Sequence, residues 1–317
     1  MSLKSNLLAE LETHRDTALS GQTLAERFGV TRNAVWKAVN ALKSEGYAVE
    51  STPNRGYRLA PDTDRLSAEG IRATLQADIP VYCFESLDST NNEAKRRLAG
   101  GEAGPFLIAA EEQTAGRGRL GRAFCSPKGT GLYITVALAS GGSAESALGV
   151  TAYAAVSVAD AVERLTGRQT RIKWVNDLFL GDKKVCGILT EAVTDFESGM
   201  LESLLVGIGI NLRPGEIPIE LQDTVGSLDC ATPAKNRLAA AITDALLAYP
   251  PASPGYLSAY RARSLTLGRH VRWRQGEQSG EGVAVDIDST GALVVQSNDD
   301  TRVTLRSGEV ALLPEAR

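Results

Sequence analysis

The loop Gly116–Arg122 carries the densest set of groups that can do chemistry, because three arginines are interspersed with three glycines. Guanidinium groups bind phosphate or carboxylate oxygens through paired donors, and glycine lets the backbone approach a ligand. The letters match the dinucleotide fingerprint Gly-x-Gly-x-x-Gly, but the polar segment 123–131 that follows cannot begin the helix that this fingerprint requires. We therefore predict a flexible anion-binding loop, with an arginine-rich RNA-binding turn as the alternative.

A second polar segment, Lys173-Trp-Val-Asn-Asp177, follows a predicted strand at the point where the chain should turn. Lys173 can neutralise a phosphate, and Asp177 can bind a magnesium ion or orient a nucleophile. A surface ion pair beside a buried Trp174 explains the same residues equally well. The segment taken alone leaves both interpretations open.

Two further polar residues stand at the ends of apolar strands. Lys184 directly precedes a predicted buried strand, where a lysine is usually only solvated. Asn211 ends the apolar run that begins at Gly207, and its amide can hydrogen-bond to the edge of an adenine. An Asx turn that terminates the strand is the alternative for Asn211.

The first 60 residues have the pattern of a winged helix-turn-helix. Gly29 ends one short amphipathic helix as a left-handed cap, and Thr31 begins the next. A turn around Thr52–Gly56 then joins two short strands. A recognition helix in the major groove would present its outward side chains to DNA, here Arg32, Asn33, Lys37, Asn40 and Lys43, with Arg55 and Arg58 beside the wing. A protein-interaction domain with a solvated basic face is the alternative.

Composition excludes several classes of protein. The 317 residues carry a net charge of −4, but residues 1–60 have eight Lys and Arg against six Asp and Glu. The four cysteines are far apart, which argues against a zinc ribbon, a redox dithiol and a disulfide scaffold and fits a reducing cytoplasm. With two histidines, a His-rich metal site is excluded and a Ser-His-Asp hydrolase is disfavoured. We also find neither an apolar run long enough to span a membrane nor a secretory signal.

The elements that must position these residues change in character along the chain. Residues 65–260 alternate strands and helices, which predicts a mixed α/β sheet. We expect strands at 80–85, 106–111, 132–138, 171–174, 185–192 and 204–210, and helices at 90–98, 147–165 and 235–247. Pro61–Asp64 has the composition of a linker. Five short strands after residue 269 predict a small β-barrel.

Taken in chain order, these segments resemble a biotin protein ligase. The resemblance rests on Ser89-Thr-Asn91, Glu112-Gln113, the Gly116–Arg122 loop, Lys173–Asp177, Lys184 and Asn211, and it covers essentially all 317 residues. The predicted winged helix-turn-helix at the start of the chain makes it similar to the bifunctional kind, which is both ligase and biotin operon repressor. Two departures from the family are Val175, where proline is usual, and Phe124, where tryptophan is common beside the nucleotide. Phe124 can still stack on adenine, with less area.

The resemblance implies a multidomain α+β fold. It predicts an N-terminal winged helix-turn-helix (1–62), a central mixed α/β catalytic domain of class II synthetase type (63–264) and a C-terminal small β-barrel (265–317). The implied activity joins biotin and ATP into biotinoyl-5′-AMP and transfers biotin to a lysine of the biotin carboxyl carrier protein of acetyl-CoA carboxylase. The implied partners also include Mg²⁺, operator DNA of biotin genes and a second copy of the chain, in the cytoplasm.

The same resemblance assigns residues to roles. The implied catalytic residues are Arg119, Lys173 and Asp177. Biotin would be held by Ser89, Thr90, Asn91, Gln113, Arg117, Gly118, Arg119, Lys184 and Gly187. ATP and the adenylate would be held by Arg119, Arg122, Phe124, Lys173, Asn176 and Asn211, and DNA by Arg32, Asn33, Lys37, Asn40 and Arg55. We expect Arg119 to have no packing role, and we assign no metal ligands.

Three alternatives compete with this hypothesis. A transcription factor could sense a small ligand through a non-catalytic ligase-like domain, although the full set of catalytic-type residues argues against it. A lipoate ligase shares the catalytic fold, but the helix-turn-helix head is unexplained by that function. An RNA-modifying enzyme would use the arginine loop but leaves Lys184 and Ser89–Asn91 unexplained.

Overall fold

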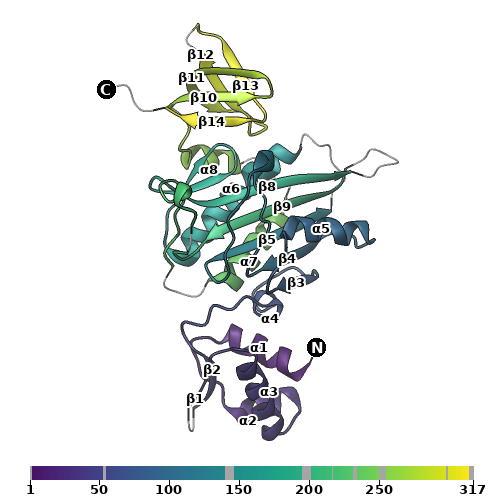
Figure 1. Ribbon diagram of the computed structural model, residues 1–317. Helices are drawn as coiled ribbons and strands as arrows, with labels where there is room; N and C mark the ends of the chain where they lie inside the picture. Colours follow the sequence, from purple (N-terminus) through teal and green to yellow (C-terminus); the bar gives the residue numbers. More distant parts are fainter. Residues whose placement is uncertain are drawn as a thin grey trace.

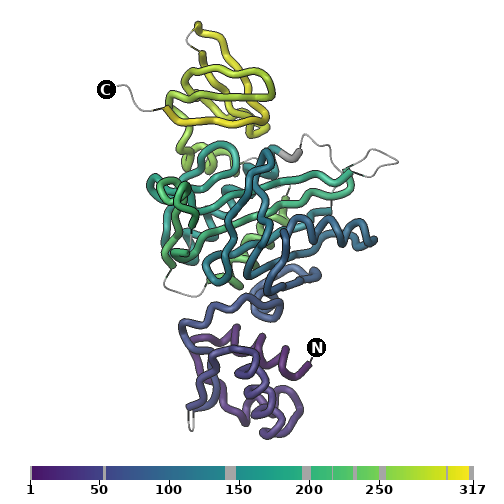
Figure 2. Tube along the Cα trace, viewed as in Figure 1, coloured from purple at the N-terminus to yellow at the C-terminus, as the bar shows by residue number. Residues whose placement is uncertain are grey.

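The computed structural model describes residues 2–52, 55–139, 146–194, 201–215, 217–230, 234–249, 255–297 and 299–313. We call residues 2–59 the head, residues 60–67 the linker, residues 68–264 the body and residues 270–312 the C-terminal sheet. The head and the C-terminal sheet lie at opposite ends of the body (Figure 1), and the chain trace passes through the three in order (Figure 2). No described helix is long and apolar enough to cross a membrane.

The head is a three-helix bundle with a hairpin, made of α1 (Leu3–Thr13), α2 (Gly21–Phe28), α3 (Arg32–Ser44), β1 (Val49–Thr52) and β2 (Gly56–Leu59). The hydroxyls of Ser2, Ser20 and Thr31 cap the three helices by accepting a hydrogen bond from the backbone N–H three residues later. Gly29 ends α2 at φ 62°, as predicted. The head therefore has the expected helix-turn-helix order, while residues 53 and 54 of the predicted turn lie outside the described residues.

A seven-stranded mixed sheet forms the centre of the body, in the order β3-β4-β5-β9-β8-β7-β6. Its strands are β3 (Val81–Phe84), β4 (Phe106–Ala110), β5 (Gly131–Ala139), β6 (Arg171–Lys173), β7 (Asp177–Leu180), β8 (Lys183–Thr194) and β9 (Leu201–Asn211). Only the β3–β4 pair is parallel among these strands. The mixed α/β prediction is confirmed, and β7 is a strand that the sequence analysis did not predict.

Helices cover both faces of this sheet: α4 (Ala68–Arg72), α5 (Thr90–Ala99), α6 (Ser146–Thr166), α7 (Lys235–Leu247) and α8 (Tyr256–Ala262). Side chains alternate between the faces, so Ile134 and Val136 of β5 join the main core with α6 and α7. Ala137 instead joins a smaller core with Ala94 and Leu98 of α5. The sheet therefore has a fully covered face and a second face that α5 covers only in part.

The C-terminal sheet has five antiparallel strands in the order β13-β12-β11-β10-β14. They are β10 (His270–Gln275), β11 (Gln278–Ile287), β12 (Leu293–Ser297), β13 (Arg302–Leu305) and β14 (Glu309–Leu312). Gly308, between β13 and β14, has φ 101°, and a Cβ there would lie 2.1 Å from the carbonyl oxygen of Arg274. This tight turn requires glycine and places Gly308 and Glu309 at the edge of the sheet that meets the body.

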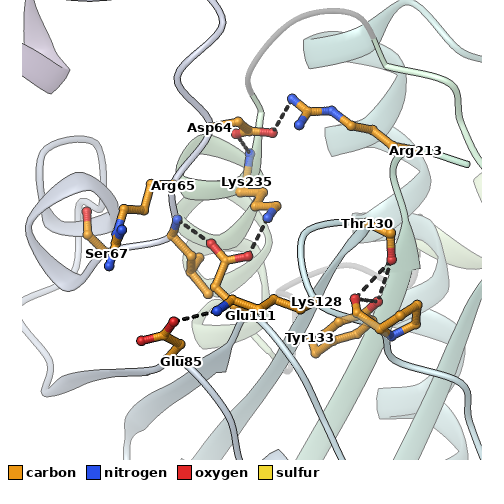
Figure 3. Close-up of polar contacts among 12 residues, drawn as sticks. Asp64, Arg65, Ser67, Glu85, Glu111, Lys128, Thr130, Tyr133, Arg213 and Lys235 are labelled. Atoms are coloured by element: carbon orange, nitrogen blue, oxygen red, sulfur yellow. Dashed lines mark hydrogen bonds and ion pairs between the residues drawn. The ribbon is translucent and has the colours of Figure 1, made fainter. Parts of the chain in front are cut away.

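Asp64 bonds the predicted linker firmly to the body (Figure 3). One oxygen of Asp64 accepts from the backbone N–H groups of Ala234 and Lys235 at 2.9 and 3.0 Å, and the other accepts from Arg213 at 3.1 Å. Asp64 thereby satisfies donors at the start of α7 that a helix cannot satisfy itself. The side chain of Lys235, only 3% exposed, pairs with Glu111 at 2.6 Å.

Asn236 connects three segments at the same junction. The side-chain oxygen Oδ1 of Asn236 accepts a hydrogen bond from the backbone N–H of Ser67 at 3.0 Å. Its amide donates to Glu12 of α1 and to the carbonyl of Arg65, both at 3.1 Å. Because head, linker and body all meet on this one buried side chain, the head is held against the body by directional bonds.

We expect Asp64→Ala to lower the free energy of unfolding by about 1–3 kcal/mol, because α7 loses its capping oxygen and Arg213 loses its partner. Urea unfolding followed by circular dichroism measures this loss. Asp64→Asn keeps an oxygen acceptor for α7 and should lose less. Asp62→Ala is the matched control, since Asp62 is exposed and two residues away. Equal midpoints for Asp64→Ala and Asp62→Ala would contradict the capping role.

Candidate active site

A cavity of about 480 Å³ opens on the partly covered face of the sheet, within the size range of small-molecule sites. It brings together every site residue predicted for the body: Ser89, Thr90, Asn91, Gln113, Arg117, Gly118, Arg119, Arg122, Phe124, Lys173, Asn176, Asp177, Lys184, Gly187 and Asn211. Its lining holds five cations, from Arg117, Arg119, Arg122, Lys173 and Lys184, against three carboxylates, from Asp177, Asp182 and Glu309. The cavity is therefore suited to an anionic ligand.

Glycines in β8 and β9 form the floor of the cavity. Gly187 and Gly209 pair across the two strands, and both face the ring of Phe124. A Cβ on Gly209 would lie 2.3 Å from Phe124 Cε1, and a Cβ on Gly207 would lie 2.3 Å from Asn91 Oδ1. The absence of a side chain at these positions lets the Phe124 ring and the Asn91 amide, both part of the cavity lining, lie directly against the two strands.

The start of α5 supplies one hydrogen-bonding wall. Ser89 is the N-cap residue of α5, yet its buried hydroxyl makes no capping hydrogen bond. The backbone N–H and hydroxyl of Thr90 both donate to Gln113 Oε1, at 2.9 and 3.0 Å. The amide of Gln113 in turn donates to Ser126 Oγ at 2.9 Å. These bonds fix the Gln113 side chain and leave the Ser89 hydroxyl available to a ligand.

Glu191 anchors the neighbouring part of this wall. It accepts from Asn91 Nδ2 at 2.7 Å and from Lys95 Nζ at 2.7 Å, and Arg117 lies 3.3 Å away. Burial raises the pKa of Glu191, but the bonds from Lys95 and Asn91 outweigh burial and the net shift is downward. Glu191 is therefore a fixed negative charge. Thr135 completes the group by donating to Asn91 Oδ1 at 2.6 Å.

Lys173 and Lys184 lie at the opposite side, on β6 and β8. Lys184 Nζ lies 2.8 Å from Asp177 Oδ1, a buried oxygen with no aligned hydrogen-bond donor in the described chain. No described carboxylate lies within ion-pair distance of Lys173, whose Nζ is 6.0 Å from the centre of the Phe179 ring. Burial lowers the pKa of Lys173, although Asp177 opposes that shift. A bound anion would restore the missing counter-charge.

The arginines of the loop are held by other parts of the chain. Arg119 donates to Asn176 Oδ1 at 3.1 Å and to the carbonyl of Gly308 at 2.8 Å. Arg122 pairs with Glu309. The expectation that Arg119 has no packing role is therefore wrong, because its guanidinium bridges the body and the C-terminal sheet. Burial lowers the pKa of Arg119, while Asp177 and Glu309 oppose the shift.

Two amides near the cavity make structural bonds. Asn176 donates from Nδ2 to the carbonyl of Ile188 at 2.9 Å, so it positions Arg119 relative to β8. Asn211 donates to the carbonyl of Gly226 at 2.9 Å. The Asn211 amide thus ties down the segment after β9, while its predicted contact with adenine stays a prediction. Val175, one of the two departures from the family pattern, follows a cis peptide bond.

The loop itself forms a short turn and no α-helix. Arg119–Gly121 is a 3₁₀ turn with Leu120 at φ 55°, and the described residues 122–130 contain no helix. This agrees with the rejection of a dinucleotide-binding fingerprint.

The predicted DNA-contacting residues lie on the head, away from the cavity. Arg32, Asn33 and Lys37 are exposed on α3, and Asn40 is half-buried on the same helix. Arg55 is exposed beside β2. The arrangement leaves one side of α3 open for a partner, as a recognition helix requires.

Several residues of the cavity escaped the sequence analysis. Glu191 and Glu309 pair with loop arginines, but they lie far from the loop in sequence and carry no motif. Gly207 and Gly209 could have been found, because two glycines two residues apart in an apolar strand leave a gap on one face. Among the described residues there is no cluster of three His, Cys, Asp or Glu side chains that could hold a metal by itself.

Comparison with known proteins identifies three family profiles in the chain. The biotin/lipoate A/B protein ligase family matches residues 83–211. A helix-turn-helix domain matches residues 4–58, and the biotin protein ligase C-terminal domain matches residues 266–313. The three matches fall on the body, the head and the C-terminal sheet.

Curated relatives match nearly the whole chain, and a solved structure matches about three quarters of it. The bifunctional ligase/repressor BirA of Escherichia coli is 30% identical over 96% of this chain and 95% of its own. The solved biotin protein ligase of Aquifex aeolicus, in complex with biotin and ATP, is 27% identical with a TM-score of 0.61, covering 74% of this chain and 98% of that one. The bifunctional ligase/repressor BirA of Bacillus subtilis is 31% identical over 94% of this chain and 95% of its own. This chain therefore belongs to the bifunctional ligase/repressor family of biotin protein ligases.

Proposed function

We propose that the chain attaches biotin to a carrier protein in two steps and uses its head to repress transcription of biotin-synthesis genes. The observation that carries the ligase half is one cavity in which the uncharged side chains of Ser89, Thr90, Asn91 and Gln113 face a group of cations. Biotin offers a neutral ureido ring and one carboxylate, and ATP offers phosphates. The Aquifex relative, solved with biotin and ATP, supports the same pairing of ligands.

In the first step, a biotin carboxylate oxygen attacks the α-phosphate of ATP. A new bond between this oxygen and the α-phosphorus gives an acyl phosphate. The bond from the α-phosphorus to the pyrophosphate breaks, and pyrophosphate leaves. Arg119, Arg122 and Lys173 would bind the phosphates and compensate the charge that develops. Gln113, Ser89 and the backbone near Gly187 would hold biotin through hydrogen bonds.

In the second step, a lysine amine of a biotin carboxyl carrier protein attacks the carbonyl of the mixed anhydride. An amide forms, AMP leaves, and the amine gives up a proton. Asp177 lines the cavity, and its carboxylate would orient that amine or accept its proton. Closure of Arg117–Arg119 over the anhydride would exclude water from it.

Magnesium would enter with the nucleotide. The ion usually binds one or two carboxylates together with substrate phosphates. Asp177 Oδ1, buried and without an aligned donor in the described chain, fits such a contact. Mg²⁺ would supply additional positive charge at the phosphates, while the protein cations hold their orientation.

We further propose that residues 1–62, 63–264 and 265–317 act as three domains, that the carrier belongs to acetyl-CoA carboxylase, and that the chain works in the cytoplasm. The curated relatives named ligase/repressor support the combination of the two activities. The exposed side of α3 supports DNA binding by the head.

Pyrophosphate release from ATP tests the ligase half directly. We expect release with biotin and Mg²⁺, and none with lipoate. Transfer to a purified apo-carrier domain, read by mass spectrometry, should follow. Release with lipoate alone would favour a lipoate ligase, and absence of release with either acid would favour a ligand sensor without catalysis.

Lys184→Ala should weaken biotin binding by roughly 10- to 150-fold while changing ATP binding far less, because one charge-assisted contact in the cavity is lost. Calorimetry with each ligand separately measures both affinities. Lys183→Ala is the matched control: the neighbouring lysine donates to the carbonyl of Gln222 and lies outside the cavity lining. Equal losses for the two ligands would refute the assignment of Lys184 to biotin.

The pH dependence of activity should report Lys173. Its pKa in the free protein lies below the ordinary value of 10.5 because burial disfavours the charged form. The cation is therefore lost as pH rises through this lowered pKa, and kcat/KM for ATP should fall before an ordinary lysine would titrate. Lys173→Arg should move that alkaline fall upward. An alkaline limb unchanged by Lys173→Arg would assign it to another group.

We propose that biotinoyl-5′-AMP promotes a homodimer, since a single winged head makes few DNA contacts and two heads are needed for useful affinity. The ligand can do so only if it binds the dimer-competent form more tightly. Sedimentation with biotin and ATP should show a dimer, and excess apo-carrier should reverse it. A monomer under all conditions, or a dimer indifferent to ligand, would contradict the proposal.

A further inference from the structure

Trp36 is the exposed aromatic of the head. Its side chain on α3 is 54% exposed, and it is one of only four exposed large hydrophobic side chains among the described residues. Its indole N–H has no partner in the described chain. A single exposed apolar side chain is common on a protein surface, so exposure alone identifies no partner. The position of this indole, on the outward side of the predicted recognition helix, is what points to an external partner.

The helix places Trp36 among the predicted DNA contacts. Successive residues turn by about 100°, so positions three, four and seven apart share a side of the helix. Asn33, Trp36, Lys37 and Asn40 therefore form one outward stripe. The opposite side of α3 holds Val35, Ala38, Val39 and Leu42, all buried in the head.

Charge and polarity around Trp36 identify the partner. Its neighbours on the stripe are amides and a lysine, and Arg32, Lys43 and Arg55 add positive charge at the margins. A protein partner with an apolar pocket would be matched by further apolar residues around the tryptophan. Basic and amide side chains instead complement the phosphates and base edges of a DNA major groove.

The major groove offers one apolar feature to such a side chain, the C5-methyl group of thymine. We propose that Trp36 is a specificity-determining residue of the repressor, and that its indole packs against a thymine methyl group in each half-site. This inference rests on the DNA-binding function proposed for the head. It adds a base-reading contact of a different chemistry from the hydrogen bonds of Asn33 and Asn40.

The test removes the methyl group without changing base pairing. The full chain, with biotin and ATP, first selects duplexes from a pool of random sequence. Each thymine of the selected duplex is then replaced singly by deoxyuridine. We expect one thymine in each half-site at which the replacement weakens wild-type binding about fourfold, the effect of one buried methyl-sized group. Trp36→Ala should bind the thymine duplex more weakly and show no response to deoxyuridine at that position.

Control variants separate this contact from others. Trp36→Phe should retain part of the methyl sensitivity. Lys37→Ala should weaken binding to thymine and deoxyuridine duplexes equally and reduce the salt slope by about one. Circular dichroism checks that each variant keeps its helices, and the deoxyuridine arm on the wild-type protein needs no variant at all.

Several results would overturn the proposal. Wild-type affinity in Trp36→Ala would show that the indole makes no contact with DNA. Equal weakening of Trp36→Ala on thymine and deoxyuridine duplexes would assign the indole to sugar or phosphate. A wild-type protein that enriches no duplex would refute the DNA-binding function itself. If deoxyuridine weakens the binding of the wild-type protein and of Trp36→Ala by the same factor at every position, the methyl group is read by another residue. That result would refute only the role of Trp36.

Discussion

Convergence of positive charge on one cavity is the constraint on which the rest of the site depends. Cations brought this close repel one another, and for Arg119 and Lys173 partial burial also removes water that would screen the charge. Carboxylates on three strands supply part of the compensation: Glu191 for Arg117, Asp177 for Lys184 and Glu309 for Arg122. The remaining excess of positive charge gives the site its affinity for phosphate and carboxylate. The C-terminal sheet therefore contributes directly to the cavity through Glu309 and Val310.

The shape of the cavity depends on a second constraint, the alternation of side chains between the two faces of a strand. Ile208 and Ile210 of β9 face the main core, so Gly207 and Gly209 necessarily face the cavity. Any larger side chain at Gly209 would meet the ring of Phe124. The same strand thus provides core packing on one face and ligand space on the other.

Most elements could be predicted from the sequence because their signals are local. Gly29 and Thr31 mark a helix boundary by themselves, and the Gly116–Arg122 loop is recognisable from its composition. The partners of that loop could not be predicted. The Gly308 carbonyl reaches Arg119, and Glu309 reaches Arg122, only through the tertiary fold. The sequence therefore could not reveal the bonding partners of Arg119, and the expectation that it has no packing role was wrong. The strand β7 was missed because Asp177 and the polar turn before it resemble a loop.

The head and the cavity are connected through a short stretch of chain. Glu111 accepts from the backbone N–H of Leu66 in the linker at 2.8 Å and also pairs with Lys235. Two residues further on, Gln113 holds Thr90 in the wall of the cavity. A ligand that repositions Gln113 therefore acts on the segment to which the linker is bonded. Spatial continuity of this kind carries coupling between the cavity and the head only where the segment has two discrete arrangements that a ligand binds with different affinity.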